Sequence, residues 1–251
     1  MFESLKNKRV LITGASSGIG RCTAELFAAH GAVCAIHFSE NREGAQRTVD
    51  AIQSRCGSAE LFQVDFSEWP SGSQLIRNVI KTMGGLDVLV NNAGALLGRI
   101  DFLKLDEGSW DLTYALNVKA PFFLSQEAFQ HMQKNGGGRI INISSISAKY
   151  GGTAVSLHYG SAKAALEAVT RGLSRLGAEH DILVNAVRCG FIDSGFHEKI
   201  AWSREEIRER IERIPLGRPG KPMDAARMVL FLASEAGNHI TGEIFTVSGG
   251  D

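Results

Sequence analysis

Thr13-Gly14-Ala15-Ser16-Ser17-Gly18-Ile19-Gly20 follows the short apolar run Val10-Leu11-Ile12, and this junction decides the fold. The glycines let the backbone turn tightly and approach a pyrophosphate with no Cβ in the way. A helix that starts here offers free N–H groups and its positive dipole end to phosphates. The spacing Gly-x3-Gly-x-Gly therefore predicts a dinucleotide site, although a glycine turn of this kind would also serve simply to pack a helix on a strand.

Apolar runs recur along the rest of the chain and alternate with segments of helical spacing. Continuous β-branched runs are typical of strands buried on both faces of a parallel sheet. The longest helical segments run from Leu112 to Met132 and from His158 to Glu179. The alternation predicts right-handed βαβ crossovers with helices on both faces. Besides Val10–Ile12, the expected strands are Val33–Phe38, Glu60–Val64, Leu86–Val90, Arg139–Ile143, Leu183–Val187 and Glu243–Val247.

Composition excludes several classes of protein. The chain of 251 residues has 27 Lys plus Arg and 27 Asp plus Glu, so it lacks the basic excess that a nucleic-acid binder or a membrane-surface protein needs. No apolar run approaches the roughly 20 residues that span a bilayer, and the N-terminus does not read as a signal peptide. The four cysteines have no paired spacing, which is typical of reduced thiols in the cytoplasm. No paired ligand pattern involves the histidines, so we expect no catalytic metal.

Polar residues follow the third and fourth expected strands. Asp65 and Phe66 follow the third, and Asn91-Asn92-Ala93-Gly94 ends the fourth. Ligands of open parallel sheets bind beyond the carboxyl ends of the strands. We therefore expect these residues to meet the glycine turn around one extended ligand, with Asp65 able to accept a hydrogen bond from an adenine amine.

Tyr159 and Lys163 lie four residues apart on an expected helix and so share one of its faces. An isolated tyrosine has a pKa of about 10, too high for efficient acid–base catalysis at neutral pH. A neighbouring ammonium favours the phenolate and lowers that pKa. The pair is a candidate acid–base centre, although taken alone it fits a solvated lysine one turn from a core tyrosine better.

The motifs together resemble the single-domain branch of the short-chain dehydrogenase/reductase family, in particular enzymes of the 3-oxoacyl-[acyl-carrier-protein] reductase type. The resemblance covers essentially the whole chain. It implies an α/β fold of the Rossmann type, with a doubly wound, seven-stranded parallel sheet and helices on both faces. It rests on this ordered series: Thr13–Gly20, Asn91–Gly94, Asn117, Ser145, Tyr159, Lys163 and Cys189–Ser194.

The resemblance also implies a role for each of four residues. Tyr159 exchanges a proton with the substrate oxygen, and Ser145 hydrogen-bonds that oxygen. Lys163 binds the nicotinamide ribose and lowers the pKa of Tyr159, while Asn117 fixes a water that links Lys163 to solvent. Ser144 is the alternative to Ser145, but neighbouring strand residues face opposite sides, and the family aligns its serine with the second. Cys189 replaces a usual proline, which predicts a freer loop at that point.

The second strand carries the evidence on the choice of cofactor. The position where NAD enzymes usually carry a carboxylate aligns with Phe38. Ser39, Asn41 and Arg42 offer hydrogen bonds or charge to a 2′-phosphate, so we expect NADP(H) in preference to NAD(H), with Glu40 as the opposing signal. All expected cofactor contacts are Gly14, Ser16, Ser17, Gly18, Ile19, Gly20, Ser39, Asn41, Arg42, Asp65, Phe66, Asn92, Ala93, Gly94, Tyr159, Lys163, Gly190, Ile192 and Ser194.

We expect one domain over residues 1–251, with a substrate lid inserted at about 191–220 that includes a charged surface helix over Ser203–Arg213. The substrate pocket is expected from Leu96–Ile100, Ala148–Val155 and Phe191–Trp202. A charge at Arg99, His197 or Lys199 would bind an acidic substrate, but these residues fit a solvated lid surface better. By resemblance the helices at about 107–133 and 157–180 pair between subunits, giving a homodimer or homotetramer.

Three functions remain open at this point. The first is reduction of a 3-oxoacyl thioester or a related ketone, with or without delivery of the substrate by a carrier protein. The second is an NAD-dependent alcohol, sugar or steroid dehydrogenase. The third is a non-catalytic dinucleotide sensor or scaffold, which the presence of Ser145, Tyr159 and Lys163 argues against.

Overall fold

The computed structural model describes residues 2–67, 71–196 and 202–251, and its backbone is organised around one seven-stranded sheet. The strand order is β3-β2-β1-β4-β5-β6-β7, and every neighbouring pair is parallel. The predicted α/β fold is confirmed. The strands are β1 Arg9–Ile12, β2 Val33–Phe38, β3 Ser58–Gln63, β4 Val88–Asn91, β5 Gly138–Ser145, β6 Ile182–Cys189 and β7 Ile244–Val247.

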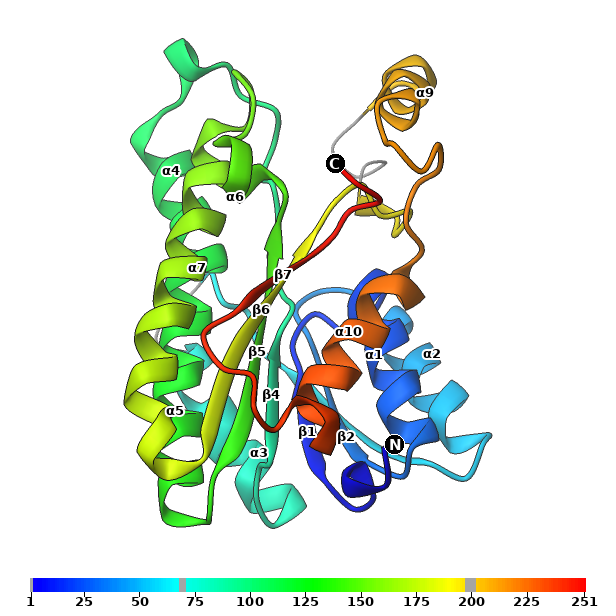
Figure 1. Cartoon of the computed structure of the whole chain (residues 1–251), viewed down its shortest axis with the longest axis vertical. Coiled ribbons are helices and arrows are strands. Elements are labelled where there is room, and N and C mark those ends of the chain that lie inside the picture. The colour runs from blue at the N-terminus through cyan, green and yellow to red at the C-terminus, as the bar shows by residue number, and fades with distance from the viewer. Residues whose placement is uncertain (1, 68–70, 197–201) are drawn as a thin grey trace.

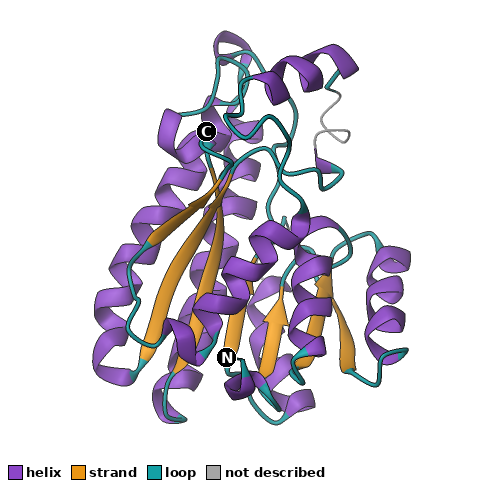
Figure 2. Ribbon diagram, turned by 45° about the vertical axis from the view of Figure 1, so that its right-hand side comes forward, coloured by secondary structure: helices purple, strands orange, loops and turns teal. Residues whose placement is uncertain are grey.

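Helices cover both faces of this sheet (Figures 1 and 2). Successive strand residues enter opposite cores: Val10 and Ile12 pack with α1 and α10, whereas Leu11 packs on the side of α3 and α5. One layer contains α1 Gly18–Ala29, α2 Arg42–Gln53 and α10 Pro222–Ala233. The other contains α3 Leu75–Met83, α5 Ala120–Lys134 and α7 Leu157–Gly177.

Two neighbouring strands, β5 and β6, extend further than their apolar runs predict. β5 continues to Ser145 and β6 to Cys189, because the two strands stay in register over eight residue pairs from Gly138 with Ile182 onward. β3 instead begins earlier than expected, at Ser58, because its pairing with β2 starts there. Neighbouring strands, rather than local hydrophobicity, fix these ends.

The segment predicted as one helix at about 107–133 is interrupted. α4 spans Glu107–Tyr114, a π-helical turn spans Ala115–Lys119, and α5 follows directly. In the π turn the Ala120 N–H bonds to the Ala115 carbonyl, one residue further back than in an α-helix. Asn117 lies in this turn and is fully buried.

Residues 191–220 leave the sheet and return to it. Ile192 forms an isolated parallel bridge with Gly220, and the Gly220 N–H donates to the Phe191 carbonyl at 2.9 Å. Between them lies α9, Arg204–Glu212, the expected charged surface helix, which buries no residue. His197 and Lys199, expected in the pocket, lie outside the described residues. Across the ranges that the structure describes, no helix is both long and apolar enough to cross a bilayer.

Candidate active site

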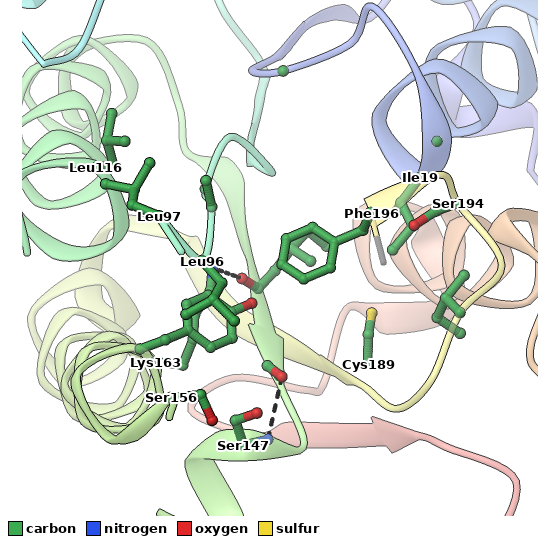
Figure 3. Close-up of a pocket in the computed structure, with 18 of the residues that line it drawn as sticks. Ile19, Leu96, Leu97, Leu116, Ser147, Ser156, Lys163, Cys189, Ser194 and Phe196 are labelled. Carbon is green, nitrogen blue, oxygen red and sulfur yellow. Dashed lines mark hydrogen bonds between the residues drawn. The ribbon is translucent and has the colours of Figure 1, made fainter. Parts of the chain in front are cut away.

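A cavity of about 1380 Å³ runs across the carboxyl ends of the strands. Its walls come from the turns after β1 to β6 and from α7 and α9. The order of the sheet reverses between β1 and β4, which is the point where open α/β sheets bind ligands. Figure 3 shows Leu96, Phe196 and Cys189 around the same cavity as Lys163.

The turns after β1 and β4 are tied together by Thr13 and Asn92. The Thr13 hydroxyl accepts from the Asn92 N–H at 3.0 Å and the Ala93 N–H at 2.9 Å. The Asn92 side chain donates back to the Thr13 carbonyl at 2.8 Å. Gly14, at a φ of 64°, lies so close to Ala93 that a Cβ would stand 3.0 Å from the Ala93 Cα. The glycine turn is thus held open toward the cavity.

His37 is a site residue that the sequence interpretation missed. Its Nδ1 accepts from the Gly14 N–H at 3.2 Å, and its Nε2 lies 3.0 Å from the Val64 carbonyl, to which it donates. The ring stacks on Phe66 with centroids 4.3 Å apart. Burial lowers the pKa of His37 to about 4, so the ring stays neutral and keeps both hydrogen bonds. The sequence signal that could have identified His37 is a polar residue near the end of an otherwise apolar strand.

The cavity is lined by every expected cofactor residue except two. Gly20 lies beneath the turn, where a Cβ would collide with the Gly14 carbonyl and the Asn92 side chain, so it permits close packing of helix on strand. Arg42 begins α2, and its guanidinium carbon lies 6.0 Å from the Phe38 ring centroid, outside the lining.

Ser145, Tyr159, Lys163 and Asn117 converge at one end of the cavity. Ser145 ends β5 and is hydrogen-bonded to the Tyr159 side chain. The Lys163 Nζ lies 5.7 Å from the Tyr159 ring centroid and donates to the Ile143 carbonyl at 2.9 Å. A Cβ added to Gly94 would stand 2.9 Å from the Lys163 Nζ and 2.6 Å from the Asn117 Oδ1, so both groups border the same small space.

Asn117 presents one free acceptor to that space. Its Nδ2 donates to the carbonyls of Ala95 and Thr113, both at 2.9 Å, which fixes the orientation of the amide. Its Oδ1 is buried and accepts no hydrogen bond from any residue that the structure describes. Buried polar atoms usually have a partner, so this oxygen suits a water or a ligand donor.

The protonation of the pair differs from the expectation. Burial raises the pKa of the Tyr159 phenol, and the hydrogen bond with Ser145 only partly counters this, so the expected lowering by Lys163 does not prevail. Burial also lowers the pKa of Lys163 to about 8. At neutral pH the structure therefore holds a protonated phenol beside an ammonium.

Ser144 and Ser145 point to different surroundings, as strand alternation predicts. The Ser144 hydroxyl donates to Glu167 Oε1 at 2.8 Å in the interior. Arg188 donates to both oxygens of the same carboxylate, at 2.8 and 2.6 Å. Ser144, Arg188 and Glu167 thus join β5, β6 and α7. Because Glu167 lies one helical turn after Lys163, these bonds lie directly behind the site.

Cys189 lies at the end of β6, opposite Ser145 in the register. Burial raises the pKa of its thiol to about 12. The Ile146 N–H donates to the Cys189 carbonyl at 2.7 Å, and the next N–H, of Gly190, donates to the Val247 carbonyl at 2.9 Å. These two bonds hold the backbone at Cys189 and Gly190, and the freer loop that the missing proline predicts stays a prediction.

Comparison with known proteins decides the family. A family model described as enoyl-(acyl carrier protein) reductase matches residues 14–251. A 3-oxoacyl-[acyl-carrier-protein] reductase of Thermotoga maritima is 34% identical, over 98% of each chain. The chain belongs to the short-chain dehydrogenase/reductase family.

Solved structures of this family agree with that assignment. A 7α-hydroxysteroid dehydrogenase complexed with NADH and 7-oxo glycochenodeoxycholic acid has a TM-score of 0.92 at 34% identity, covering 100% of this chain and 98% of its own. Acetoin dehydrogenase from Enterobacter cloacae has a TM-score of 0.88 at 33% identity, covering 97% and 95%. The chain is an oxidoreductase that acts on CH–OH and C=O groups, and the predicted family, fold and class of reaction are confirmed.

Proposed function

We propose that this short-chain dehydrogenase/reductase reduces a ketone with NADP(H), using Tyr159 as the proton donor. One observation carries the proposal: Ser145, Tyr159 and Lys163 meet at one end of a cavity whose other end is the glycine-rich turn. The 3-oxoacyl thioester and related ketones remain our first choice of substrate, consistent with the Thermotoga maritima relative.

The residues along the cavity fit a nicotinamide dinucleotide. The free N–H groups at the start of α1 suit the pyrophosphate, and Asp65 and Phe66 line the end that suits adenine. Gly94 leaves the space beside Lys163 open, where a ribose hydroxyl can accept from its ammonium. When bound, the reduced cofactor supplies the hydride.

Four side chains then handle the substrate oxygen and its proton. The Ser145 hydroxyl and the Tyr159 phenol donate to the carbonyl oxygen, which orients the ketone and stabilises the charge that develops on it. Tyr159 gives up its proton to this oxygen. The ammonium of Lys163 stabilises the phenolate, and a water on the Asn117 Oδ1 connects Lys163 to solvent for reprotonation.

The state of Tyr159 fits the role of proton donor in reduction. Burial raises the pKa of the phenol, so at neutral pH the group carries the proton that it gives to the substrate oxygen. The ammonium of Lys163 favours the phenolate that this transfer leaves behind.

The preference for NADP(H) rests on the end of β2. Phe38 is buried where a carboxylate would repel a 2′-phosphate, and Ser39 and Asn41 line the cavity beside the start of α2. Arg42 is held near by its contact with the Phe38 ring. Glu40 also lines this end and opposes the preference.

A hydroxysteroid, alcohol or sugar dehydrogenase is the second candidate. The likeness to the 7α-hydroxysteroid dehydrogenase and the apolar cavity wall of Leu96, Leu97 and Phe196 favour a bulky lipophilic substrate. A non-catalytic sensor would have no need of the complete group of four residues.

We also propose self-association through the outer surface of α4, α5 and α7. Large apolar side chains remain exposed there, with 39% of Trp110, 37% of Phe122 and 63% of Leu176 accessible. A homodimer or homotetramer would cover them. Light scattering after size exclusion tests this, and a monomer at all concentrations would contradict it.

We further propose that residues 191–220 act as a lid of a single domain and that the enzyme works in the cytoplasm. The bridge between Ile192 and Gly220 supports a segment with a fixed base, and the four unpaired cysteines support a reducing compartment. Cell fractionation tests the location.

The function is tested with a panel of ketones, assayed first with NADPH and then with NADH. Reduction is measured as the loss of the absorbance of the reduced nicotinamide. The panel contains 3-oxoacyl thioesters, oxosteroids, small diketones and sugars. We expect reduction of lipophilic ketones with NADPH. Failure of every carbonyl with both cofactors would contradict the proposed function.

A further inference from the structure

An ion pair lies on the substrate side of the cavity. It joins Arg99, in the loop after β4, to Glu206, in α9. The Arg99 guanidinium is 2.7 Å from Glu206 Oε1 and lies over the Trp202 ring, 5.7 Å from its centroid. Trp202 in turn packs against Phe191, with centroids 5.7 Å apart. All four residues line the cavity, so this group, Arg99, Glu206, Trp202 and Phe191, is called the mouth.

Glu206 serves two partners with its two carboxylate oxygens. Its Oε2 accepts from the Ser203 N–H at 2.8 Å, and its own N–H donates to the Ser203 hydroxyl at 3.2 Å, which forms a capping box at the start of α9. Its Oε1 is left for Arg99. These bonds hold the pKa of Glu206 at about 2, so the carboxylate stays charged at any assay pH.

Charge is balanced pair by pair around this opening. Among the described residues, three arginines and three acidic side chains line the substrate side of the cavity, and each arginine is paired with one of the acids. The pairs are Arg99 with Glu206, Arg210 with Asp251 and Arg213 with Glu209. Figure 1 shows α9 and the C-terminal residue at the same end of the molecule.

The cavity also contains a group of apolar side chains. Leu96, Leu97 and Phe196 line it, as Figure 3 shows, together with Ser147 and Ser156, and the centroid of the Phe196 ring lies 6.2 Å from that of the Tyr159 ring. Because Arg99 and Tyr159 line the same cavity, a ketone of sufficient length with its carbonyl at Tyr159 can extend its other end toward Arg99. There it meets an arginine whose charge is already neutralised.

We propose that Glu206 is a specificity-determining residue: by pairing with Arg99 it makes the cavity select uncharged, lipophilic ketones over ketones with a distal carboxylate. The inference rests on the proposed carbonyl reduction and narrows its substrate class. A distal carboxylate would lose its hydration at the mouth and meet Glu206 together with Arg99, whereas an ester or an alkyl chain loses little.

The test uses matched pairs of keto acids and their methyl esters, namely 5-oxohexanoate, 7-oxooctanoate and 9-oxodecanoate, so that one chain length reaches Arg99. The ratio of kcat/KM for ester over acid is measured in the wild type and in Glu206→Gln. Glutamine keeps the capping box and loses the charge. The control is Glu205→Gln, which removes a neighbouring acid that pairs with Arg208 and does not line the cavity.

We expect the wild type to prefer the ester and Glu206→Gln to shift the ratio toward the acid by roughly tenfold, about 1.4 kcal/mol. Glu205→Gln should leave the ratio unchanged, and adding Arg99→Met to Glu206→Gln should abolish the shift. A wild type that prefers the acid, or a ratio that moves less than about twofold in Glu206→Gln, would overturn the proposal.

Calorimetric titration of the same pairs separates this proposal from the proposed function. If nothing is reduced but the ester binds the wild type more tightly than the acid, and Glu206→Gln reverses the order, the catalytic proposal fails and the role of Glu206 stands. If neither compound binds either protein, the role of Glu206 is overturned.

Discussion

Two ion pairs, Glu167 with Arg188 behind Tyr159 and Glu206 with Arg99 at the mouth, differ in their exposure to solvent. Behind Tyr159 and Lys163, Ser144, Glu167 and Arg188 form a group that we call the floor, in which 5% of the Glu167 side chain and 16% of the Arg188 side chain are exposed. At the mouth, Arg99 and Glu206 are also paired, but 33% and 39% of their side chains are exposed. Breaking a buried pair leaves a charge without solvent, whereas water replaces the partner of an exposed one. We therefore propose that the floor fixes the geometry of the site and that the mouth adjusts its selectivity.

The sharpest test of this contrast is the same substitution at both ends. Glu167→Gln removes the counterion of the partly buried Arg188 and should lower the free energy of unfolding by about 1–3 kcal/mol. Glu206→Gln should leave the urea midpoint unchanged, since the helix cap is retained. Equal midpoints for the two variants would remove the distinction between floor and mouth.

His37 allows the effect of losing buried hydrogen bonds to be tested beside the glycine turn. His37→Phe keeps an aromatic ring against Phe66 but leaves the Gly14 N–H and the Val64 carbonyl without partners. We expect a loss of about 1–3 kcal/mol in stability and weaker binding of NADPH, because the glycine turn is no longer held. Thermal unfolding and calorimetry measure the two effects. A variant with native affinity would show that the turn needs no such support.

The pH dependence of reduction probes the ammonium beside the phenol. Burial holds the pKa of Lys163 at about 8, so its charge is present below that pH and lost above it. The ketone-reduction rate should be level below pH 8 and fall by about tenfold per unit above it, because the phenolate then forms without a neighbouring cation. A rate profile that stays level far into the alkaline range would contradict this role of Lys163.

The smallest effects are expected at the exposed end of β2. Arg42→Ala should raise KM for NADPH about threefold and leave KM for NADH unchanged, as expected for a solvated charge. Glu40→Gln should have the reverse effect and lower KM for NADPH. If both substitutions change KM for NADPH and KM for NADH by the same factor, residues other than Arg42 and Glu40 determine the cofactor preference.

The sequence predicted what local patterns determine. Seven apolar runs predicted seven strands, and alternation along β5 separated Ser145 from Ser144. Tyr159 and the three residues that converge on it, Asn117, Ser145 and Lys163, were all named from motifs. The strands and the alternation along β5 depend on residues that are close in the chain. The site residues belong to an ordered series of motifs that is typical of a single fold.

The rest depends on partners that are distant in sequence. The π turn at Asn117 has no local signal, and the ends of β3, β5 and β6 follow the registers of neighbouring strands. The pairing of Arg99 with Glu206 joins residues from separate loops. The pKa of Tyr159 was predicted from its charged neighbour, but burial, which no motif reports, dominates it.

The most direct test of the central claim is the Tyr159→Phe variant, in which only the phenol oxygen is lost. Calorimetry measures NADPH binding, and rapid mixing measures reduction of the best ketone of the panel. The account predicts nearly native NADPH affinity with ketone reduction slower by at least about a hundredfold, the lower range for loss of a general acid. Reduction at a nearly native rate in this variant would contradict the assignment of Tyr159 as the proton donor.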